Sequence, residues 1–349
     1  MEKKRTMKAM VLEAFNTPLV LKELPVPTPA ANEVLIRLMA DGVCYTDVKI
    51  QKGLMPTAKL PLVMGHEIAG IVEEVGSEVK ELKVGDKVAA FTYDVCGECH
   101  YCRRGIPALC ENVRGMAGCT RNGGYEEYMT WPESALVKIP EGIPFEIAAV
   151  TTDAVTTCYH ALCERVSVKE GDTVLIMGVG GLGINAVQIA KALGATVIAA
   201  ARNEKKLEMA KNCGADYVFS TTAVNLPEEC RKLTGGRGVD ISADFAGNKA
   251  ATELAFACLA PGGVQVQPGY SPGEKFEVDY MHFLVGERTL VASRAATKKS
   301  LEGALKLVAE GKVKPQIDSS AIMPLERVNE ILDRLKAGDI IGRGVIKYY

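Results

Sequence analysis

Short hydrophobic segments separated by polar or small residues fill the first part of the chain. Between residues 34 and 88, apolar runs such as Val34–Leu38 and Ile68–Gly76 are separated by glycine-containing turns. Alternation with a period of two is typical of β-strands that bury one face. This part of the sequence therefore predicts antiparallel β structure in the form of a small barrel.

From Gly171 onward, the pattern changes to short apolar runs that alternate with longer helical segments. Such strand and helix alternation favours a parallel, doubly wound α/β sheet. The predicted helices span residues 182–193 and 203–212. The predicted strands are Thr173–Met177, Thr196–Ala200, Tyr217–Phe219, Val239–Ala243, Val264–Gln267 and Thr289–Ser293.

The last part, residues 300–349, begins with an amphipathic helix and passes through a proline-containing turn. A second helix is predicted near Leu325–Ala337, followed by a β-like run at Gly344–Lys347. The pattern by itself does not assign this tail to either domain.

Composition and charge bound the class of protein. The chain has 349 residues, 48% of them hydrophobic, which suggests two domains. Its 41 basic and 43 acidic residues give a net charge of -2, so no broad attraction to nucleic acid or anionic membrane is expected. The basic start lacks the apolar core of a signal peptide, and no apolar run reaches membrane-spanning length. We therefore expect a cytoplasmic protein that acts on a small molecule.

Four of the eleven cysteines are clustered. An odd cysteine count in a chain of this length argues against a disulfide framework. Four thiolates at short spacing satisfy a tetrahedral Zn²⁺ with no open position, and we favour zinc over the alternative, an iron–sulfur cluster. The predicted structural zinc ligands are Cys96, Cys99, Cys102 and Cys110.

A second metal site is suggested by dispersed residues. Cys44 and His66 are suitable zinc ligands on separate β segments, although either alone is more often a packing group. Their neighbours strengthen the hypothesis: Asp47 can orient the imidazole, Thr46 offers a hydroxyl, and Glu67 adds a carboxylate.

A dinucleotide fingerprint lies between the first predicted strand and helix of the α/β part. The spacing G-x-G-x-x-G in this context indicates a loop that lets a pyrophosphate approach the backbone at a helix N-terminus. The predicted contacts are Gly178, Gly180, Gly181, Leu182 and Gly183.

The second strand of this part lacks the acidic residue that would bind the ribose hydroxyls of NAD. Ala201 occupies that place and Arg202 follows it. Absence of a carboxylate and presence of a guanidinium favour the 2'-phosphate of NADP. Lys205 and Lys206 are candidate helpers, or simply residues of a solvated helix face.

Together these motifs resemble the zinc-dependent medium-chain alcohol dehydrogenases. The resemblance rests on the Cys44–Asp47 and Gly65–Gly70 motifs, the four-cysteine lobe, the glycine fingerprint and the ending Ile341–Val345. It implies a GroES-like β-barrel catalytic domain at 1–155, a Rossmann domain at 156–295 and a segment at 296–349 that returns to the catalytic domain. It also implies two zinc ions, a nicotinamide cofactor and a homo-oligomer.

The resemblance also implies further site residues. The family's third ligand of the catalytic zinc is a cysteine or carboxylate at the end of the first domain, which maps to Asp153, with Cys158 as the competitor. The family's proton acceptor maps to Thr46, and its proton-relay histidine is replaced here by Lys49. Further family-type cofactor contacts map to Ala246, Pro268, Gly269 and, at the pyrophosphate, Arg343.

The expected function is zinc-dependent hydride transfer between an alcohol and NADP, with aldehyde or ketone reduction in reverse. Two alternatives stay open: an NAD-dependent dehydrogenase of a hydroxyacyl-CoA or another bulky secondary alcohol, and a zinc-independent enoyl or quinone reductase of the same fold. Leu54 and Met55 stand where many relatives have an aromatic, which suggests a roomier apolar pocket unless they only pack.

Overall fold

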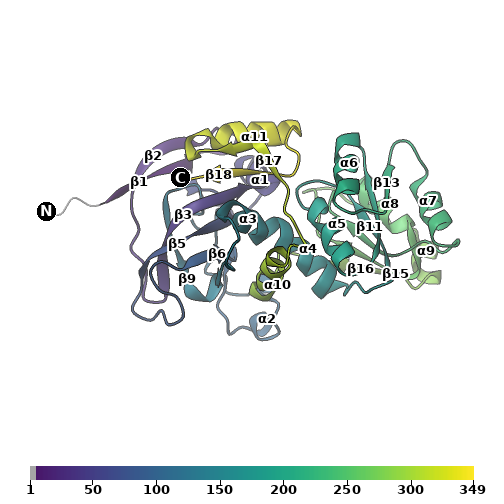
Figure 1. Ribbon diagram of the computed structural model, residues 1–349, viewed down its shortest axis with the longest axis horizontal. Helices are drawn as coiled ribbons and strands as arrows, with labels where there is room; N and C mark the ends of the chain where they lie inside the picture. Colours follow the sequence, from purple (N-terminus) through teal and green to yellow (C-terminus); the bar gives the residue numbers. More distant parts are fainter. Residues whose placement is uncertain (1–4) are drawn as a thin grey trace. The chain divides into compact units, whose positions relative to one another are not determined.

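The computed structural model describes residues 5–349, so the first four positions of the predicted first domain lie outside the described residues. The chain forms two compact units (Figure 1). Among the described residues, the first contains 5–153 together with 297–309 and 317–349, and the second contains 154–296 and 310–316.

The predicted tail, 296–349, is therefore divided between the units. Residues 310–316 belong to the second unit, where the Lys314 backbone N–H donates to Oε1 of Gln188 at 2.8 Å. The Gln188 amide donates in turn to the Lys314 carbonyl at 3.1 Å. These two reciprocal hydrogen bonds explain why residues 310–316 belong to the second unit, whereas most of the tail belongs to the first.

The first unit is built on β-sheets. Its largest sheet has the order β10-β6-β5-β3-β18-β17, with β9 also paired to β3, and smaller sheets have the orders β2-β1-β4 and β7-β8. Central strand β3 is buried along almost its whole length. The strands are β1 Thr6–Leu12, β2 Val20–Pro25, β3 Glu33–Val43, β4 Leu62–Val63, β5 Glu67–Val75, β6 Lys87–Ala90, β7 Tyr93–Asp94, β8 Gly115–Met116, β9 Tyr128–Pro132, β10 Leu136–Lys138, β17 Ile317–Met323 and β18 Arg343–Lys347.

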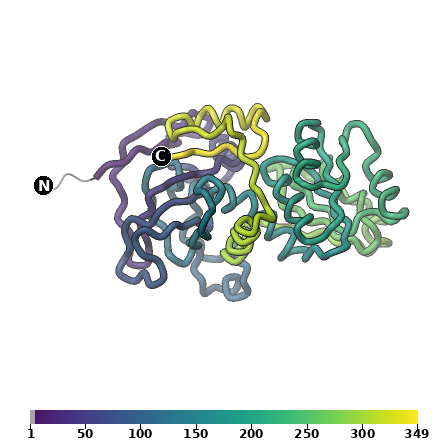
Figure 2. Tube along the Cα trace, viewed as in Figure 1, coloured from purple at the N-terminus to yellow at the C-terminus, as the bar shows by residue number. Residues whose placement is uncertain are grey.

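The end of the chain completes this sheet. Strand β18 pairs antiparallel with β3 and parallel with β17, so it lies between them. Figure 2 shows the yellow C-terminal trace beside the purple N-terminal strands of the same unit. The helices of this unit are α1 Tyr45–Gln51, α2 His100–Arg103, α3 Phe145–Val150, α10 Lys298–Ala309 and α11 Val328–Ala337.

The second unit contains a six-stranded parallel sheet with the order β13-β12-β11-β14-β15-β16. Each strand overlaps a predicted one, whereas α4, α7, α8 and α9 are additional to the two predicted helices. The strands are β11 Thr173–Met177, β12 Thr196–Ala201, β13 Tyr217–Ser220, β14 Val239–Asp244, β15 Leu259–Gln267 and β16 Thr289–Ala292. The helices are α4 Thr156–Tyr159, α5 Gly183–Ala192, α6 Glu204–Asn212, α7 Leu226–Leu233, α8 Lys249–Ala257 and α9 Tyr280–Val285.

Among residues 5–349, the structure has no helix with the length and apolar character needed to cross a membrane.

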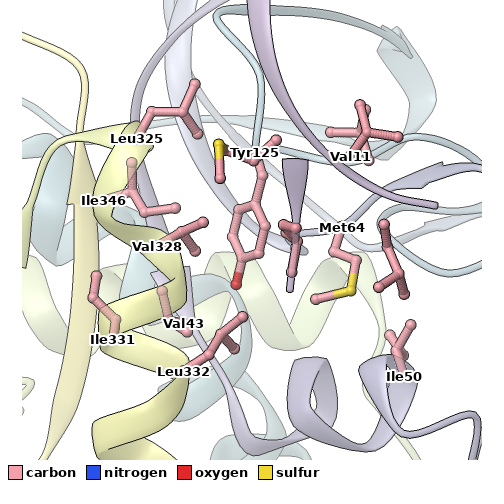
Figure 3. Packing of buried hydrophobic residues seen from close by; sticks show 14 of the residues in the cluster. Val11, Val43, Ile50, Met64, Tyr125, Leu325, Val328, Ile331, Leu332 and Ile346 are labelled. Atoms are coloured by element: carbon pink, nitrogen blue, oxygen red, sulfur yellow. The ribbon is translucent and has the colours of Figure 1, made fainter. Parts of the chain in front are cut away.

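A hydrophobic core in the first unit surrounds the fully buried ring of Tyr125. Figure 3 shows this ring between Val328 and Leu332 of α11 on one side and Met64 on the other. Residues from both ends of the chain therefore meet around one aromatic side chain. Burial of such apolar surface, at roughly 25 cal/mol per Å², is the main force that holds the tail in place.

Candidate metal centres and cofactor site

The four clustered cysteines converge on one point in the first unit. The sulfurs of Cys96 and Cys110 lie 3.5 Å apart, those of Cys99 and Cys110 3.9 Å, and those of Cys96 and Cys102 4.0 Å. Four sulfurs around a tetrahedral zinc ion at ~2.3 Å each lie about 3.8 Å from one another. The spacing and the donor set therefore fit the predicted structural zinc.

Backbone N–H groups of the lobe favour thiolates. The Cys99 N–H points to the Cys96 sulfur at 3.4 Å, and the Cys96 N–H to the Cys110 sulfur at 3.5 Å. Hydrogen bonds from the backbone at Cys102 and Glu111 lower the pKa of Cys99 to about 6, whereas burial raises the pKa of Cys102 to about 12. A metal ion would remove the remaining protons, because only the thiolate binds it.

A second donor group lies inside the first unit. The ligand atoms of Cys44, His66, Glu67 and Asp153 all lie within 4.8 Å of one another. The first three residues are buried and Asp153 is partly buried. The structure thus brings together the three residues predicted to bind the catalytic zinc and the carboxylate predicted beside them.

Cys44 is held by the start of helix α1. It is the N-cap residue, and its sulfur accepts from the Thr46 N–H at 3.5 Å. The Asp47 carboxylate accepts in return from the Cys44 N–H at 2.8 Å, which completes a capping box. This capping box fixes the main chain that carries the Cys44 sulfur.

His66 follows a glycine that the fold requires. Gly65 has φ +94°, and a Cβ at this position would lie 2.5 Å from the Tyr125 ring. Nδ1 of His66 lies 3.1 Å from Oδ1 of Asp47, which leaves Nε2 as the nitrogen for a metal ion. Burial lowers the pKa of His66, but the Asp47 carboxylate outweighs this effect and the net pKa lies well above the ordinary value.

Glu67 and Asp153 share one guanidinium. Arg343 of β18 is buried and forms ion pairs with both carboxylates, with Nη2 2.7 Å from Oδ2 of Asp153. The same Asp153 oxygen lies 3.6 Å from the Cys44 sulfur. Burial raises the pKa of Glu67 well above its usual range against the opposing effect of Arg343. Two carboxyl groups, a thiol and an imidazole within 4.8 Å of one another are the side-chain types that bind zinc, so the donor set fits this ion.

The competing cysteine lies elsewhere. Cys158 is fully buried in α4 of the second unit, and its sulfur contacts the Leu182 carbonyl at 3.2 Å. Asp153 lies in a π-helical turn, Thr151–Val155, that follows α3. Turns of this kind widen the helix and are frequent at functional sites.

The other residues predicted around this centre lie on or just after α1. Thr46 and Lys49 are partly buried, and burial lowers the pKa of Lys49 while the Cys44 charge opposes the shift. Met55 packs against the core, whereas Leu54 is exposed.

The glycine fingerprint of the second unit has three distinct local environments. Gly178, at the end of β11, has φ +87°, and a Cβ there would lie 2.7 Å from the Ala246 nitrogen. At Gly183 a Cβ would lie 2.0 Å from the Gly178 carbonyl oxygen. At Gly180, by contrast, no described atom lies within 4 Å of the Cβ position, so the loop leaves open space there. A phosphate-binding turn requires glycines that allow a tight turn and close backbone packing, and one that leaves room for the phosphate.

The carboxyl end of β12 lies next to this turn. The Gly178 N–H donates to the Ala200 carbonyl at 2.8 Å, Ala201 is buried, and Arg202 is exposed directly after the strand. Asn203 caps α6 by accepting from the Lys206 N–H.

Sequence reasoning missed a buried carboxylate that shapes the remaining cofactor loops. Asp244, at the end of β14, accepts from the N–H groups of Ala246 and Gly247 at 2.8 and 3.0 Å. It also accepts from Thr252 and from Gln267, the residue before Pro268. The Gly269 N–H donates to its carbonyl at 2.9 Å. An aspartate inside an apolar strand pattern gives no signal of these distant partners.

The predicted contact of Arg343 with the cofactor's pyrophosphate stays a prediction. In the structure this side chain is in the first unit, where it pairs with Glu67 and Asp153. Sequence reasoning did not anticipate these ion pairs, because the partner Glu67 is 276 positions away.

Comparisons with known proteins agree with this picture. Two family models match the chain, an alcohol dehydrogenase GroES-like domain over residues 30–141 and a zinc-binding dehydrogenase domain over residues 181–310. An alcohol dehydrogenase of Geobacillus stearothermophilus is 40% identical over 343 residues, which are 98% of this chain and 99% of that one. Acryloyl-coenzyme A reductase of Sulfurisphaera tokodaii is 34% identical over 343 residues, covering 98% and 100% of the two chains. A crystal structure of an NAD-dependent alcohol dehydrogenase matches with a TM-score of 0.92 and 34% identity over 98% of this chain and 100% of that one. These similarities confirm the predicted fold class, a GroES-like barrel plus a Rossmann-type unit.

Proposed function

The chain belongs to the zinc-type medium-chain dehydrogenase/reductase family, and on that premise we propose that it catalyses reversible hydride transfer between an alcohol and NADP. In the forward direction an alcohol and NADP⁺ give an aldehyde or ketone, NADPH and a proton. The observation that carries the proposal is a group of four donors within 4.8 Å of one another, the buried Cys44, His66 and Glu67 and the partly buried Asp153.

The chain's own residues divide the work at this centre. Cys44, His66 and Asp153 bind the metal ion, and Glu67 lies beside them in its ion pair with Arg343. When bound, zinc supplies a Lewis acid for the substrate oxygen. Keeping three protein ligands leaves the open position that catalytic zinc sites use.

Proton transfer falls to helix α1. The hydroxyl of Thr46, in the first turn next to Cys44, accepts the alcohol proton. Lys49, one turn further, is partly buried with a lowered pKa, which supports a role in passing the proton on. We propose this relay role for Lys49 rather than a role in an ion pair at the surface, because the side chain is partly buried.

The preference for NADP over NAD rests on the end of β12. Ala201 leaves no carboxylate to repel a 2'-phosphate, and the exposed Arg202 guanidinium is available to bind one. Lys206 in the first turn of α6 is a second candidate contact. The similarity to an NAD-dependent alcohol dehydrogenase favours NAD instead. The preference between NADP and NAD must therefore be measured.

The test combines metal content with turnover. We expect two zinc ions per purified chain by elemental analysis, and nicotinamide reduction with NADP⁺ and a panel of alcohols. Cys44→Ala should lose one zinc and all alcohol oxidation while the fold is retained. Cys99→Ala is the matched control, because it should lose the other zinc and lower stability first. A stoichiometry of one zinc that persists after zinc supplementation would contradict the proposal.

A second candidate is reduction of an enoyl thioester by NADPH to the saturated acyl thioester. The similarity to acryloyl-coenzyme A reductase over nearly the whole chain supports it. Acryloyl-CoA with NADPH is therefore included in the same assay, for the wild type and for Cys44→Ala. Reduction that survives Cys44→Ala, together with no oxidation of any alcohol, would favour this second function.

We also propose that the protein is a cytoplasmic homo-oligomer. All eleven cysteines are thiols in the structure, which suits a reducing compartment such as the cytoplasm.

The proposed oligomer rests on the far edge of the parallel sheet. Helix α9 exposes Tyr280, Met281 and Val285 by 61% or more, and β16 is the terminal strand of its sheet among the described residues. A second copy that pairs along β16 would cover both features. Light scattering after size exclusion should give a multiple of 37.4 kDa, and Val291→Pro should reduce it to one chain.

A further inference from the structure

One buried carboxylate connects two of the metal donors. Oδ2 of Asp47 accepts from the Cys44 N–H at 2.8 Å, and Oδ1 lies 3.1 Å from Nδ1 of His66. Asp47 is fully buried, so no solvent supports it. The orientation of this carboxylate therefore sets both the main chain at Cys44 and the imidazole plane of His66.

Tyr125 makes the third contact to this carboxylate. Its hydroxyl donates to Oδ2 of Asp47 at 2.9 Å, and its side chain is fully buried. Oδ2 thus receives two donors that fix its position, the Cys44 N–H and the phenol. A buried carboxylate oxygen that loses one of its two donors is held less firmly, and part of its acceptor capacity is left unmet.

The phenol ring is itself firmly placed. The Tyr125 N–H donates to the Met64 carbonyl at 2.9 Å, and its carbonyl accepts from Met10 at 2.8 Å. The ring packs against the backbone of Gly65, directly before His66, and is flanked by α11 (Figure 3). Packing in the core therefore fixes the Tyr125 phenol, and the phenol in turn fixes the Asp47 carboxylate beside Cys44 and His66.

We propose that Tyr125 is a positioning residue for the metal centre: by holding Asp47, it aligns the Cys44 thiolate and Nε2 of His66. The hydroxyl donates to Asp47 and acts through this carboxylate. This inference rests on the proposed function insofar as the ion is bound by Cys44, His66 and Asp153. The competing interpretation is a phenol that only satisfies its own hydrogen bond within the core.

The experiment measures release of zinc from the holoenzyme into excess chromogenic chelator. The phase that belongs to the Cys44 site is identified as the one missing in Cys44→Ala. Tyr125→Phe should speed this phase by about tenfold, the lower bound for loss of an outer ligand partner. The phase of the four-cysteine lobe should keep its rate and serves as the internal control.

Tyr348→Phe is the matched control variant. Its phenol is also inside the first unit and donates to the Gly124 carbonyl rather than to Asp47. Thermal unfolding of both variants verifies that they are folded, and the visible spectrum with Co²⁺ in the Cys44 site should shift only in Tyr125→Phe.

The outcomes are distinct. If the wild type does not hold a metal ion at Cys44, the proposed function fails. If it does, and Tyr125→Phe leaves the rate and spectrum unchanged or speeds both phases equally, the positioning role is overturned. An equal effect in Tyr348→Phe would also overturn it, because the cause would then be general loosening of the core.

Discussion

Single side chains at the metal centre carry more than one interaction each. Asp153 contacts the Cys44 sulfur and the Arg343 guanidinium through the same oxygen, at 3.6 and 2.7 Å. A change at this residue therefore removes a metal donor and frees a buried arginine at once. A substitution that keeps a donor should be far milder than one that removes it.

Three variants test the role of Asp153. Asp153→Ala should lose one zinc and reduce turnover by a factor of a hundred or more, on the order of 3 kcal/mol, with the cysteine lobe still loaded. Asp153→Cys should keep the metal with an altered rate, because a thiolate is a softer donor. Cys158→Ser should change little, since its sulfur packs against the Leu182 carbonyl. Elemental analysis and turnover of the three variants decide the matter, and loss of one zinc in Cys158→Ser alone would reassign the ligand.

Cofactor choice is also argued at one residue. Arg202→Ala should lower kcat/KM with NADP by about tenfold, equivalent to roughly 1.5 kcal/mol for one charge-assisted contact, and leave NAD almost unaffected. Adding Ala201→Asp should move the preference to NAD. Steady-state kinetics with both cofactors provide the measurement. A wild-type enzyme that works better with NAD would show the assignment to be wrong.

At the scale of elements, the sequence pattern predicted the sheet of the second unit better than its helices. The six strands carry continuous or alternating apolar residues, a signal that survives without knowledge of their partners. Helices α7 and α9 are only 8 and 6 residues long, and α9 is largely exposed despite its apolar residues. Periodicity over so few residues does not distinguish a helix from a strand.

In the candidate sites, local motifs could be predicted from the sequence, whereas contacts between distant residues could not. The cysteine spacing and the glycine fingerprint are local, so the sequence displays them directly. The hydroxyl of Tyr125 and the carboxylate of Asp47 are 78 positions apart, and nothing in either segment points to the other. Such networks become visible only when the packing of the strands is known.

Strand β14 supplies a prediction at this scale. Asp244→Asn keeps one acceptor oxygen but places an amide against the Thr252 and Gln267 donors, at a cost of about 2 to 3 kcal/mol. We expect a lower unfolding temperature and weaker NADP binding, because donors that face the new amide displace the side chain whose other oxygen accepts from the Ala246 and Gly247 N–H groups. Fluorescence titration and calorimetry report the two effects. Asp240→Asn, at the other end of the strand, is the control, and equal losses in both variants would refute a specific role for Asp244.

The whole molecule combines two units of different construction, and the sequence pattern distinguished them by period. The barrel and the parallel sheet were expected from alternation and from strand–helix order. The departure of 310–316 from the rest of the tail was not expected, because it depends on the reciprocal bonds between Gln188 and Lys314. No periodic signal records such a contact.

Global stability should depend on pH through Glu126. This residue is 2% exposed, its Oε2 has no hydrogen-bond partner among the described residues, and burial raises its pKa well above 4.5. A raised pKa in the folded state means that the stabilising contribution is complete below the unfolded pKa and is lost as pH rises through the folded pKa. Glu126→Gln should therefore gain stability relative to the wild type as pH rises from 5 to 8.

Thermal unfolding of both proteins at matched pH values measures this difference. Glu127→Gln, at the adjacent half-buried position where the carboxylate accepts from the Lys8 N–H, is the control and should show a much smaller trend. A gap between wild type and Glu126→Gln that stays constant with pH would contradict the assignment of the titration to Glu126.

The position of β18 between β3 and β17 has a consequence for how the protein is made. A ribosome delivers residues 154–296, nearly the whole second unit, after β3 but before β18. The parallel sheet can therefore form while the large sheet of the first unit still lacks both β17 and β18 beyond β3, and Arg343 reaches Glu67 only near the end of synthesis. During synthesis the nascent barrel presents its thiols and imidazole without that guanidinium. Pulse-labelled translation with brief proteolysis should accordingly detect protection of the second unit before the first, and the opposite order would indicate that the barrel folds without its last strand.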